Sequence, residues 1–257
     1  MTEDEVVADY DVRSPASRTL LTVVGTIVAV AVVAGLVLGA SILKRSTTVS
    51  TSDIELGDSA QIVIDAGESD LRIVQGDPDI VRVKARITSG LRKTDFQIGR
   101  RGDEIKIVSG CQTWLSPGCG VDTTLELPEG FPVVIRTTTG NVDVEEIVEG
   151  VLTIQTASGD ITGQGLELDE FAAETASGDI DADFATQPFA VKATTESGDI
   201  TATIPEGKRT YAVTAKSDSG DVSSKVESDA DGAGFIRATT RSGDISIEPK
   251  ERERDAD

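Results

Sequence analysis

The sequence predicts an all-β protein, a β-solenoid-like stack of strand-turn-strand repeats of roughly 20 residues each, preceded by one transmembrane helix. Three observations support this prediction: an uncharged apolar run near the N-terminus, a turn motif that recurs six times, and a low aromatic content of 4%. With one Trp, two Tyr and six Phe in 257 residues, the core must consist mainly of Val, Ile, Leu, Ala and Thr. Such a composition favours thin β packing.

The N-terminal element is predicted at residues 19–43, which carry no charge and exceed the roughly 20 residues that span a bilayer. A cleaved signal peptide is the alternative, but its apolar segment would be about 7 to 15 residues long and would follow a basic stretch. Residues 1–18 contain five acidic and two basic residues instead. A buried soluble helix is a further alternative, which the lack of a polar face disfavours. We therefore expect an uncleaved membrane anchor.

The orientation of this anchor is not determined by the flanking charges, because Arg13 and Arg18 on one side balance Lys44 and Arg45 on the other. Residues 1–18 are too few to fold alone, and a cysteine pair suits an exported domain. We therefore predict a single-pass cell-membrane protein with a cytoplasmic N-terminal tail. The remaining divisions are a linker at 44–51, a β-repeat domain at 52–248 outside the cytoplasm, and a disordered tail at 249–257.

The two cysteines, Cys111 and Cys119, bracket the run CQTWLSPGC. In an exported domain they would form a disulfide that closes this loop. Two reduced thiols are the alternative. A metal site would need further Cys or His ligands, which the sequence does not contain.

The repeat is the strongest signal in the sequence. It reads TTTGNV, TASGDI, TASGDI, TESGDI, SDSGDV and TRSGDI, and its glycines are separated by 19, 19, 20, 22 and 23 residues. The glycines are Gly140, Gly159, Gly178, Gly198, Gly220 and Gly243. Positions seven and five before each glycine and two after it are apolar, whereas the position four before it is polar. This alternation is typical of half-buried strands on both sides of a tight turn.

The turn residues have their own chemistry. Glycine supplies the positive φ of the turn, and the residue that follows it is Asn or Asp, which favours turn geometry. The predicted turn residues that follow glycine are Asn141, Asp160, Asp179, Asp199, Asp221 and Asp244. Three positions before each glycine stands Thr or Ser, which would form a hydroxyl ladder along the stack. The longer spacings near the C-terminus place extra residues in a polar loop at 225–234, which we expect to leave the stack undisturbed.

The N-terminal part of the domain has a degraded form of the same pattern. Ile62, Ile64, Leu71 and Ile73 bracket the sequence AGESD, and alternating apolar residues follow at 81–87. We therefore expect one domain. With its N-terminal anchor and its T-x-S-G-D-I repeats over residues 52–247, the chain resembles the bacterial family of β-strand-repeat proteins named "putative adhesins". The resemblance implies an exported β-solenoid-like domain and brings no catalytic residues.

The composition also limits the functions to be considered. The absence of His excludes Ser-His-Asp and Cys-His catalysis, and the net charge of −21 argues against nucleic acid as a partner. We predict no enzyme, cofactor, metal or catalytic residue, but a structural or interaction module at the cell envelope, either adhesin-like or related to envelope stress. Its partners would be the membrane and an envelope polymer or protein. The alternatives are a calcium-binding repeat domain, with carboxylates in line at the turns, and a polysaccharide-active enzyme with paired carboxylates.

Overall fold

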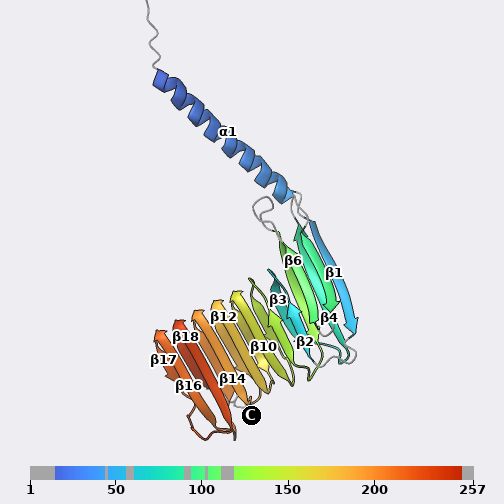
Figure 1. Cartoon of the computed structure of the whole chain (residues 1–257), viewed down its shortest axis with the longest axis vertical. Helices are drawn as coiled ribbons and strands as arrows, with labels where there is room; N and C mark the ends of the chain where they lie inside the picture. The colour runs from blue at the N-terminus through green and yellow to red at the C-terminus, as the bar shows by residue number, and fades with distance from the viewer. Residues whose placement is uncertain are drawn as a thin grey trace, which may run out of the picture.

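The computed structural model describes residues 15–43, 46–55, 61–89, 94–101, 104–110 and 119–250. Its one described helix, α1, covers Pro15–Leu43 and projects away from the strands in Figure 1. Among the described residues, none of the helical segments combines the length and the apolar character that a membrane crossing requires. The structure thus agrees with the helical conformation predicted for 19–43 and does not support its membrane-spanning role.

The strands form two sheets that face each other across the core. Sheet A contains, in spatial order, β1 (Ser46–Glu55), β4 (Ile80–Ser89), β7 (Gly120–Leu127), β3 (Asp70–Gln75), β9 (Val142–Glu145), β11 (Ile161–Leu166), β13 (Ile180–Phe184), β15 (Ile200–Pro205), β19 (Ile245–Lys250) and β17 (Val222–Ser224). Sheet B contains β16 (Tyr211–Ser219), β18 (Gly234–Ser242), β14 (Ala190–Ser197), β12 (Glu170–Ser177), β10 (Val151–Ser158), β8 (Val133–Arg136), β2 (Ile62–Asp65), β6 (Glu104–Gly110) and β5 (Asp95–Arg101).

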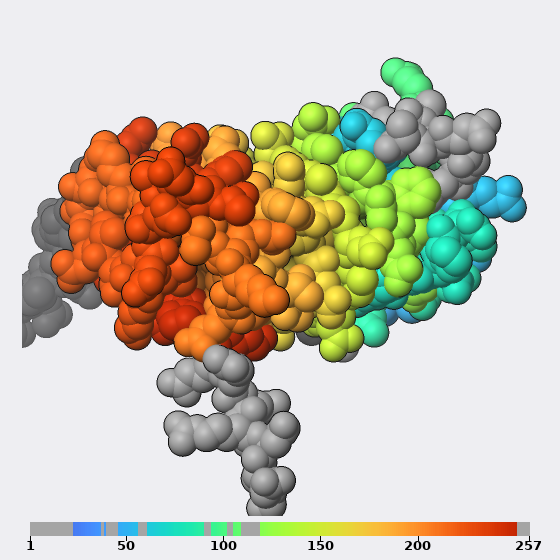
Figure 2. All heavy atoms as spheres, turned by 90° about the horizontal axis from the view of Figure 1, so that it is seen from below, coloured from blue at the N-terminus to red at the C-terminus, as the bar shows by residue number. Residues whose placement is uncertain are grey.

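Each turn motif joins a strand of sheet B to a strand of sheet A, so that one repeat is one coil of a solenoid-like stack, as predicted. Neighbouring coils pair in parallel and in register: Ile180 lies between Ile161 and Ile200. The inward columns are buried because β structure alternates its side chains between two faces, and Ile161, Ile180 and Ile200 are at most 1% exposed. Figure 2 shows the stack as one elongated body whose colours change in bands along its length.

The order of the last two coils differs from the order in the sequence. Strand β15 pairs with β19, and β14 pairs with β18, so the coil of residues 234–250 lies inside the coil of residues 211–224. The latter coil, β16–β17, forms the end of the stack (Figure 1). The chain must cross the inserted coil between β15 and β16 and cross back between β17 and β18. The longer spacing of the last repeats makes these crossings feasible. The expectation that the loop at 225–234 leaves the stack undisturbed is therefore wrong.

The N-terminal end of the stack is closed in a different way. Strands β2 and β3 form a coil next to β8 and β9, as the degraded repeat predicted. Beyond it, β4 pairs antiparallel with β7, and β1 pairs antiparallel with β4. Ser46–Glu55 is thus an edge strand, and the predicted linker at 44–51 is wrong for residues 46–51 because their Thr and Val residues favour pairing with β4.

Some predicted features lie outside the described residues. These are most of the N-terminal tail, residues 44–45, Cys111 with the loop that follows it, and residues 251–257 of the predicted disordered tail. The described domain ends with β19 at Lys250, two residues beyond the predicted boundary at 248.

Candidate functional site

The turn that repeats along the stack is the feature that the sequence analysis singled out. Its six glycines have φ values from +119° at Gly140 to +151° at Gly198, a region that L residues rarely adopt. At Gly178, an added Cβ would lie 2.2 Å from the carbonyl oxygen of Gly159 in the neighbouring coil. Glycine is therefore required both by the backbone conformation and by the close approach of successive coils.

The acidic residues of the turns form a continuous hydrogen-bonded ladder. In every coil except the last, the side-chain Oδ1 atom accepts a hydrogen bond from the backbone N–H of the corresponding residue in the next coil, with N···O distances of 2.7–3.0 Å. In spatial order the ladder runs through Asp70, Asn141, Asp160, Asp179, Asp199, Asp244 and Asp221. The sequence pattern identified these turn residues but not their mutual bonding, and it did not single out Asp70.

The hydroxyl residues form a second, buried ladder beside the first. Five of the six Oγ atoms donate to a glycine carbonyl oxygen in the neighbouring coil: Thr137 to Gly67, Thr175 to Gly159, Thr195 to Gly178, Thr240 to Gly198 and Ser217 to Gly243. The sixth, Thr156, donates to the Ser158 carbonyl oxygen of its own turn. Thr240 is only 1% exposed, so this bond satisfies a polar group within the core. The predicted hydroxyl ladder is thus present, and its role in the structure is to hold adjacent corners together.

This arrangement limits what the turn carboxylates can do. One oxygen of each inner rung already accepts a backbone N–H, and the exchange of Asn for Asp at position 141 leaves this bonding unchanged. Within the described part of the chain, no group of three or more His, Cys, Asp or Glu side chains is placed to hold a metal ion. The hydrogen bonds of the ladder therefore give the turn carboxylates a structural role, which is to join successive turns.

A second set of acidic residues lies on the outer face of sheet A and was missed by the sequence analysis. Burial raises the pKa of Asp181, and the neighbouring Asp183 carboxylate raises it further. Burial also raises the pKa of Asp143, to which the Glu145 carboxylate adds. The sequence IDADF at β13 places Asp181 and Asp183 at outward positions, and this pattern could have indicated the pair. The degree to which their carboxylates are desolvated depends on the neighbouring coils.

The outer face of sheet B has a shallow groove of about 460 Å³ near the turns. Small exposed side chains, Ala157 and Ala176, lie within it. Polar side chains from successive coils surround them: Arg136, Gln155, Glu174, Thr194 and Glu196. Because these side chains come from strands in register, they repeat at the strand spacing of about 4.8 Å. The groove is therefore a regular array of hydrogen-bonding groups, with no enclosed reaction chamber.

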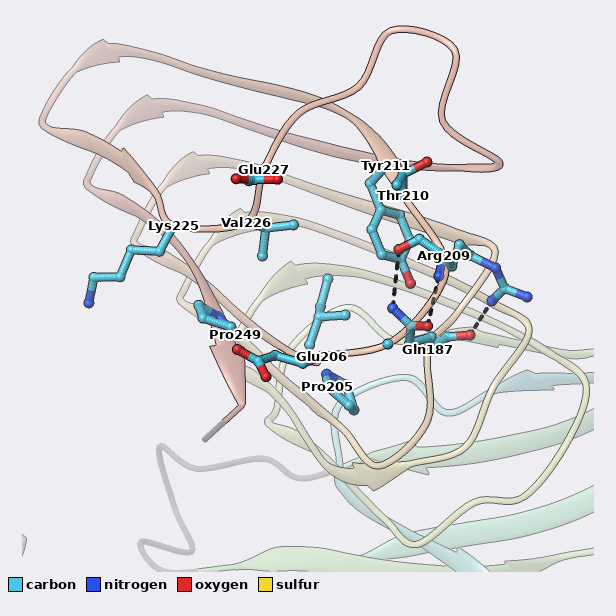
Figure 3. A pocket seen from close by; sticks show the side chains of 12 residues that line it. Gln187, Pro205, Glu206, Arg209, Thr210, Tyr211, Lys225, Val226, Glu227 and Pro249 are labelled. Carbon is cyan, nitrogen blue, oxygen red and sulfur yellow. Dashed lines mark hydrogen bonds between the residues drawn. The ribbon is translucent and has the colours of Figure 1, made fainter. Parts of the chain in front are cut away.

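A larger cavity of about 680 Å³ lies at the opposite corner of the stack, where the connection from β15 to β16 crosses the inserted coil (Figure 3). Arg209 lies over the Phe189 ring, 3.6 Å from its centroid. The Gln187 side chain holds the Arg209 backbone through two hydrogen bonds of 3.1 and 3.2 Å. Tyr211 donates its hydroxyl to the Pro188 carbonyl oxygen at 2.9 Å, and burial raises its pKa. These contacts fix the crossing connection.

An ion-pair network joins the first strands of sheet A. Arg82 on β4 contacts Asp53 at 2.8 Å, Glu126 at 2.9 Å and Asp77 at 3.3 Å. Glu126 also accepts a hydrogen bond from the Lys84 ammonium group, which, with Arg82, lowers the pKa of its carboxyl. Because Asp53, Arg82 and Glu126 come from β1, β4 and β7, and Asp77 from the connection before β4, the network fastens the antiparallel end of the sheet.

The structure describes one of the two cysteines of the predicted disulfide. Cys119, directly before β7, is disulfide-bonded. Cys111 lies outside the described residues, so the predicted pairing between Cys111 and Cys119 stays a prediction.

The fold and the stacked turns define a solenoid-like all-β domain. Residues 122–248, from β7 to β19, match the model of a family described as Toastrack DUF4097. The comparison with curated proteins found no match. Among solved structures, the chain is similar to a Clostridium sporogenes protein called a "putative cell adhesion protein", with 15% identity, a TM-score of 0.48, and coverage of 80% of this chain and 100% of that one. It is also similar to a "putative adhesin" from Bacteroides fragilis, with 16% identity, a TM-score of 0.45, and coverage of 80% and 98%.

Proposed function

We propose that this chain is a membrane-tethered β-solenoid that serves as a non-catalytic, adhesin-like interaction module at the cell envelope. The observation that carries this proposal is that outward polar side chains recur at equivalent positions of successive coils. Repetition distributes binding groups along a surface, whereas a catalytic site requires one singular cluster of groups. The turn carboxylates, which are the most regular acidic groups, act as acceptors for backbone N–H groups.

Helix α1 supports the membrane tether. Its described aliphatic side chains are exposed, from 52% at Val23 to 68% at Leu36. Residues 19–43 contain no charged residue, and an exposed apolar surface of this kind is unfavourable in water. In the proposed arrangement residues 19–43 of α1 lie in the membrane, residues 1–18 are cytoplasmic, and the strand-rich domain lies outside.

The groove on sheet B is the proposed contact surface. Polar side chains recur at equivalent positions along the stack axis, although their chemistry changes from Arg136 to Gln155 to Glu174. An extended envelope polymer or an extended segment of a partner protein would therefore meet a hydrogen-bonding side chain at each coil. The exposed side chains of Ala157 and Ala176 leave room for close contact. A flat array of this kind binds through many weak hydrogen bonds, each worth about 0.5–1.5 kcal/mol.

The topology can be tested with protease added to intact protoplasts. We expect degradation of the strand-rich domain and protection of the N-terminal tail until the membrane is permeabilised. Full protection of the domain would contradict the proposed orientation. Retention of the intact protein in the soluble fraction after cell lysis would contradict the tether itself.

The binding function can be tested with the full-length protein in lipid nanodiscs, presented to purified envelope polymers and to solubilised membrane proteins, with and without calcium. Ala176→Arg would fill the groove and should reduce capture at least about tenfold, since a buried cation and lost contacts both oppose binding. Ala185→Arg is the matched control, because Ala185 is exposed and lies at the far end of the same coil. Equal effects of the two variants would exclude the groove as the contact surface.

A further inference from the structure

The end coil, β16–β17, has a neighbouring coil on one side only. Strand β16 pairs with β18, and β17 pairs with β19. The following loop covers the start of β16, because Asp229 N–H donates to the Tyr211 carbonyl oxygen at 2.8 Å and Val213 N–H donates to Ser228 Oγ at 3.2 Å. From Thr214 to Ser219, the outer edge of β16 has no backbone partner among the described residues.

The ladders also stop at this coil. In every inner coil the turn carboxylate or amide oxygen accepts a backbone N–H from the next coil. Asp221 is the last rung, and no N–H of the described residues donates to its carboxylate. In the same way, no described hydroxyl donates to the Gly220 carbonyl oxygen, whereas Ser217 donates to the carbonyl oxygen of Gly243 in the inner coil. The end therefore presents a turn carboxylate and the outer backbone groups of β16 without the partners from a further coil that the equivalent groups of the inner coils have.

The opposite end of the molecule does not complement this edge. There, sheet A finishes with the antiparallel strands β4 and β1, and sheet B finishes with β5 antiparallel to β6. A head-to-tail contact would therefore not continue the parallel coils. The end coil can instead meet the same coil of another molecule, since twofold symmetry makes two identical edge strands antiparallel.

The charges on β16 favour such self-pairing. Lys216 and Asp218 are two residues apart, both exposed, and Ser217 between them is partly buried. In an antiparallel pair with Ser217 on the twofold axis, Lys216 of each copy lies opposite Asp218 of the other. In the single chain these two side chains form an exposed ion pair with each other, with an N···O distance of 2.9 Å. The same pairing would cover Val222, which is 46% exposed although its column is buried in the inner coils.

We propose that the end coil Tyr211–Ser224 binds the end coil of a second copy of this chain, through antiparallel pairing of the two β16 strands about Ser217. The resulting dimer is closed, because a twofold contact uses the same edge of both copies. It places the two α1 helices at opposite ends of the assembly. The inference concerns the partner of this edge and does not depend on a ligand for sheet B.

The test uses the full-length protein in detergent, with sedimentation equilibrium over a range of concentrations. Wild type should dimerise. The proposed dimer contains two symmetry-related contacts between position 216 of one copy and position 218 of the other. Lys216→Asp or Asp218→Lys would bring like charges together in both contacts and should weaken the dimer about tenfold or more. An equimolar mixture of the two variants restores opposite charges at both positions, so it should form a heterodimer about as stable as the wild-type dimer.

Lys192→Asp is the matched control for Lys216→Asp, because Lys192 is exposed on the same face of sheet B in an inner coil and the two substitutions change the net charge equally. It should leave the dimer unchanged, and circular dichroism should show that every variant is folded. A monomeric wild type would overturn the proposal. Unchanged dimers in both β16 variants, or failure of the mixture to restore association, would also overturn it, since contacts elsewhere would then join the copies.

Discussion

The order of the last two coils can be tested by comparing the effect of Val→Ala on stability in an inner coil and in the end coil. Val142 and Val222 occupy the same column, two residues after the turn glycine, but Val142 is 0% exposed and Val222 is 46% exposed. Val→Ala removes two methyl groups. At Val142, packed between Leu71 and Ile161, the loss should be about 1.5–3 kcal/mol, from about 0.8 kcal/mol for each carbon and a cavity that cannot collapse. At Val222 the space opens to solvent, and the loss should be below about 1 kcal/mol.

The assay is urea unfolding followed by circular dichroism, at a protein concentration below that of association. Ile245→Ala provides the second comparison, because Ile245 comes last in the sequence but is 1% exposed, between Ile200 and Val222. Its cost should be about 2–5 kcal/mol. If Val222→Ala destabilised the domain as much as Val142→Ala, or more than Ile245→Ala, then the order of the coils deduced here would be refuted.

Three further predictions concern the turns and the outer face of sheet A. Gly178→Ala should destabilise the domain by several kcal/mol or prevent folding, measured by thermal unfolding, because its Cβ would lie 2.2 Å from the carbonyl oxygen of Gly159. Asp179→Ala should cost about 0.5–1.5 kcal/mol by removing the acceptor of the Asp199 N–H, whereas Asp179→Asn should be nearly neutral, and added calcium should change neither result. Because the pKa of Asp181 is raised in the folded state, Asp181→Asn should increase stability at neutral pH. The gain should vanish as the pH falls below about 3.8, where the carboxyl is protonated in both states, and a gain that persisted there would contradict this explanation.

Much of the fold follows from the sequence because the repeat constrains it locally. A positive φ at Gly159 and its equivalents requires glycine, and the alternation around each turn specifies which side chains face the core. The same reasoning located β2 and β3 from a weaker pattern. It could not identify β1, because a polar Ser-Thr stretch becomes a strand only when a partner such as β4 is available.

The order of the coils, and with it the candidate surfaces, was decided only by the tertiary structure. The columns of the last two repeats are equally apolar, so periodicity cannot tell that Ile245 is buried and Val222 exposed. The choice between the two arrangements depends on which strand pairs with β14 and β15, a contact between residues far apart in the chain. The desolvation of Asp181 likewise depends on neighbouring coils. Local sequence thus determines the conformation of each coil, whereas the packing of coils against one another determines which edge of the stack remains open.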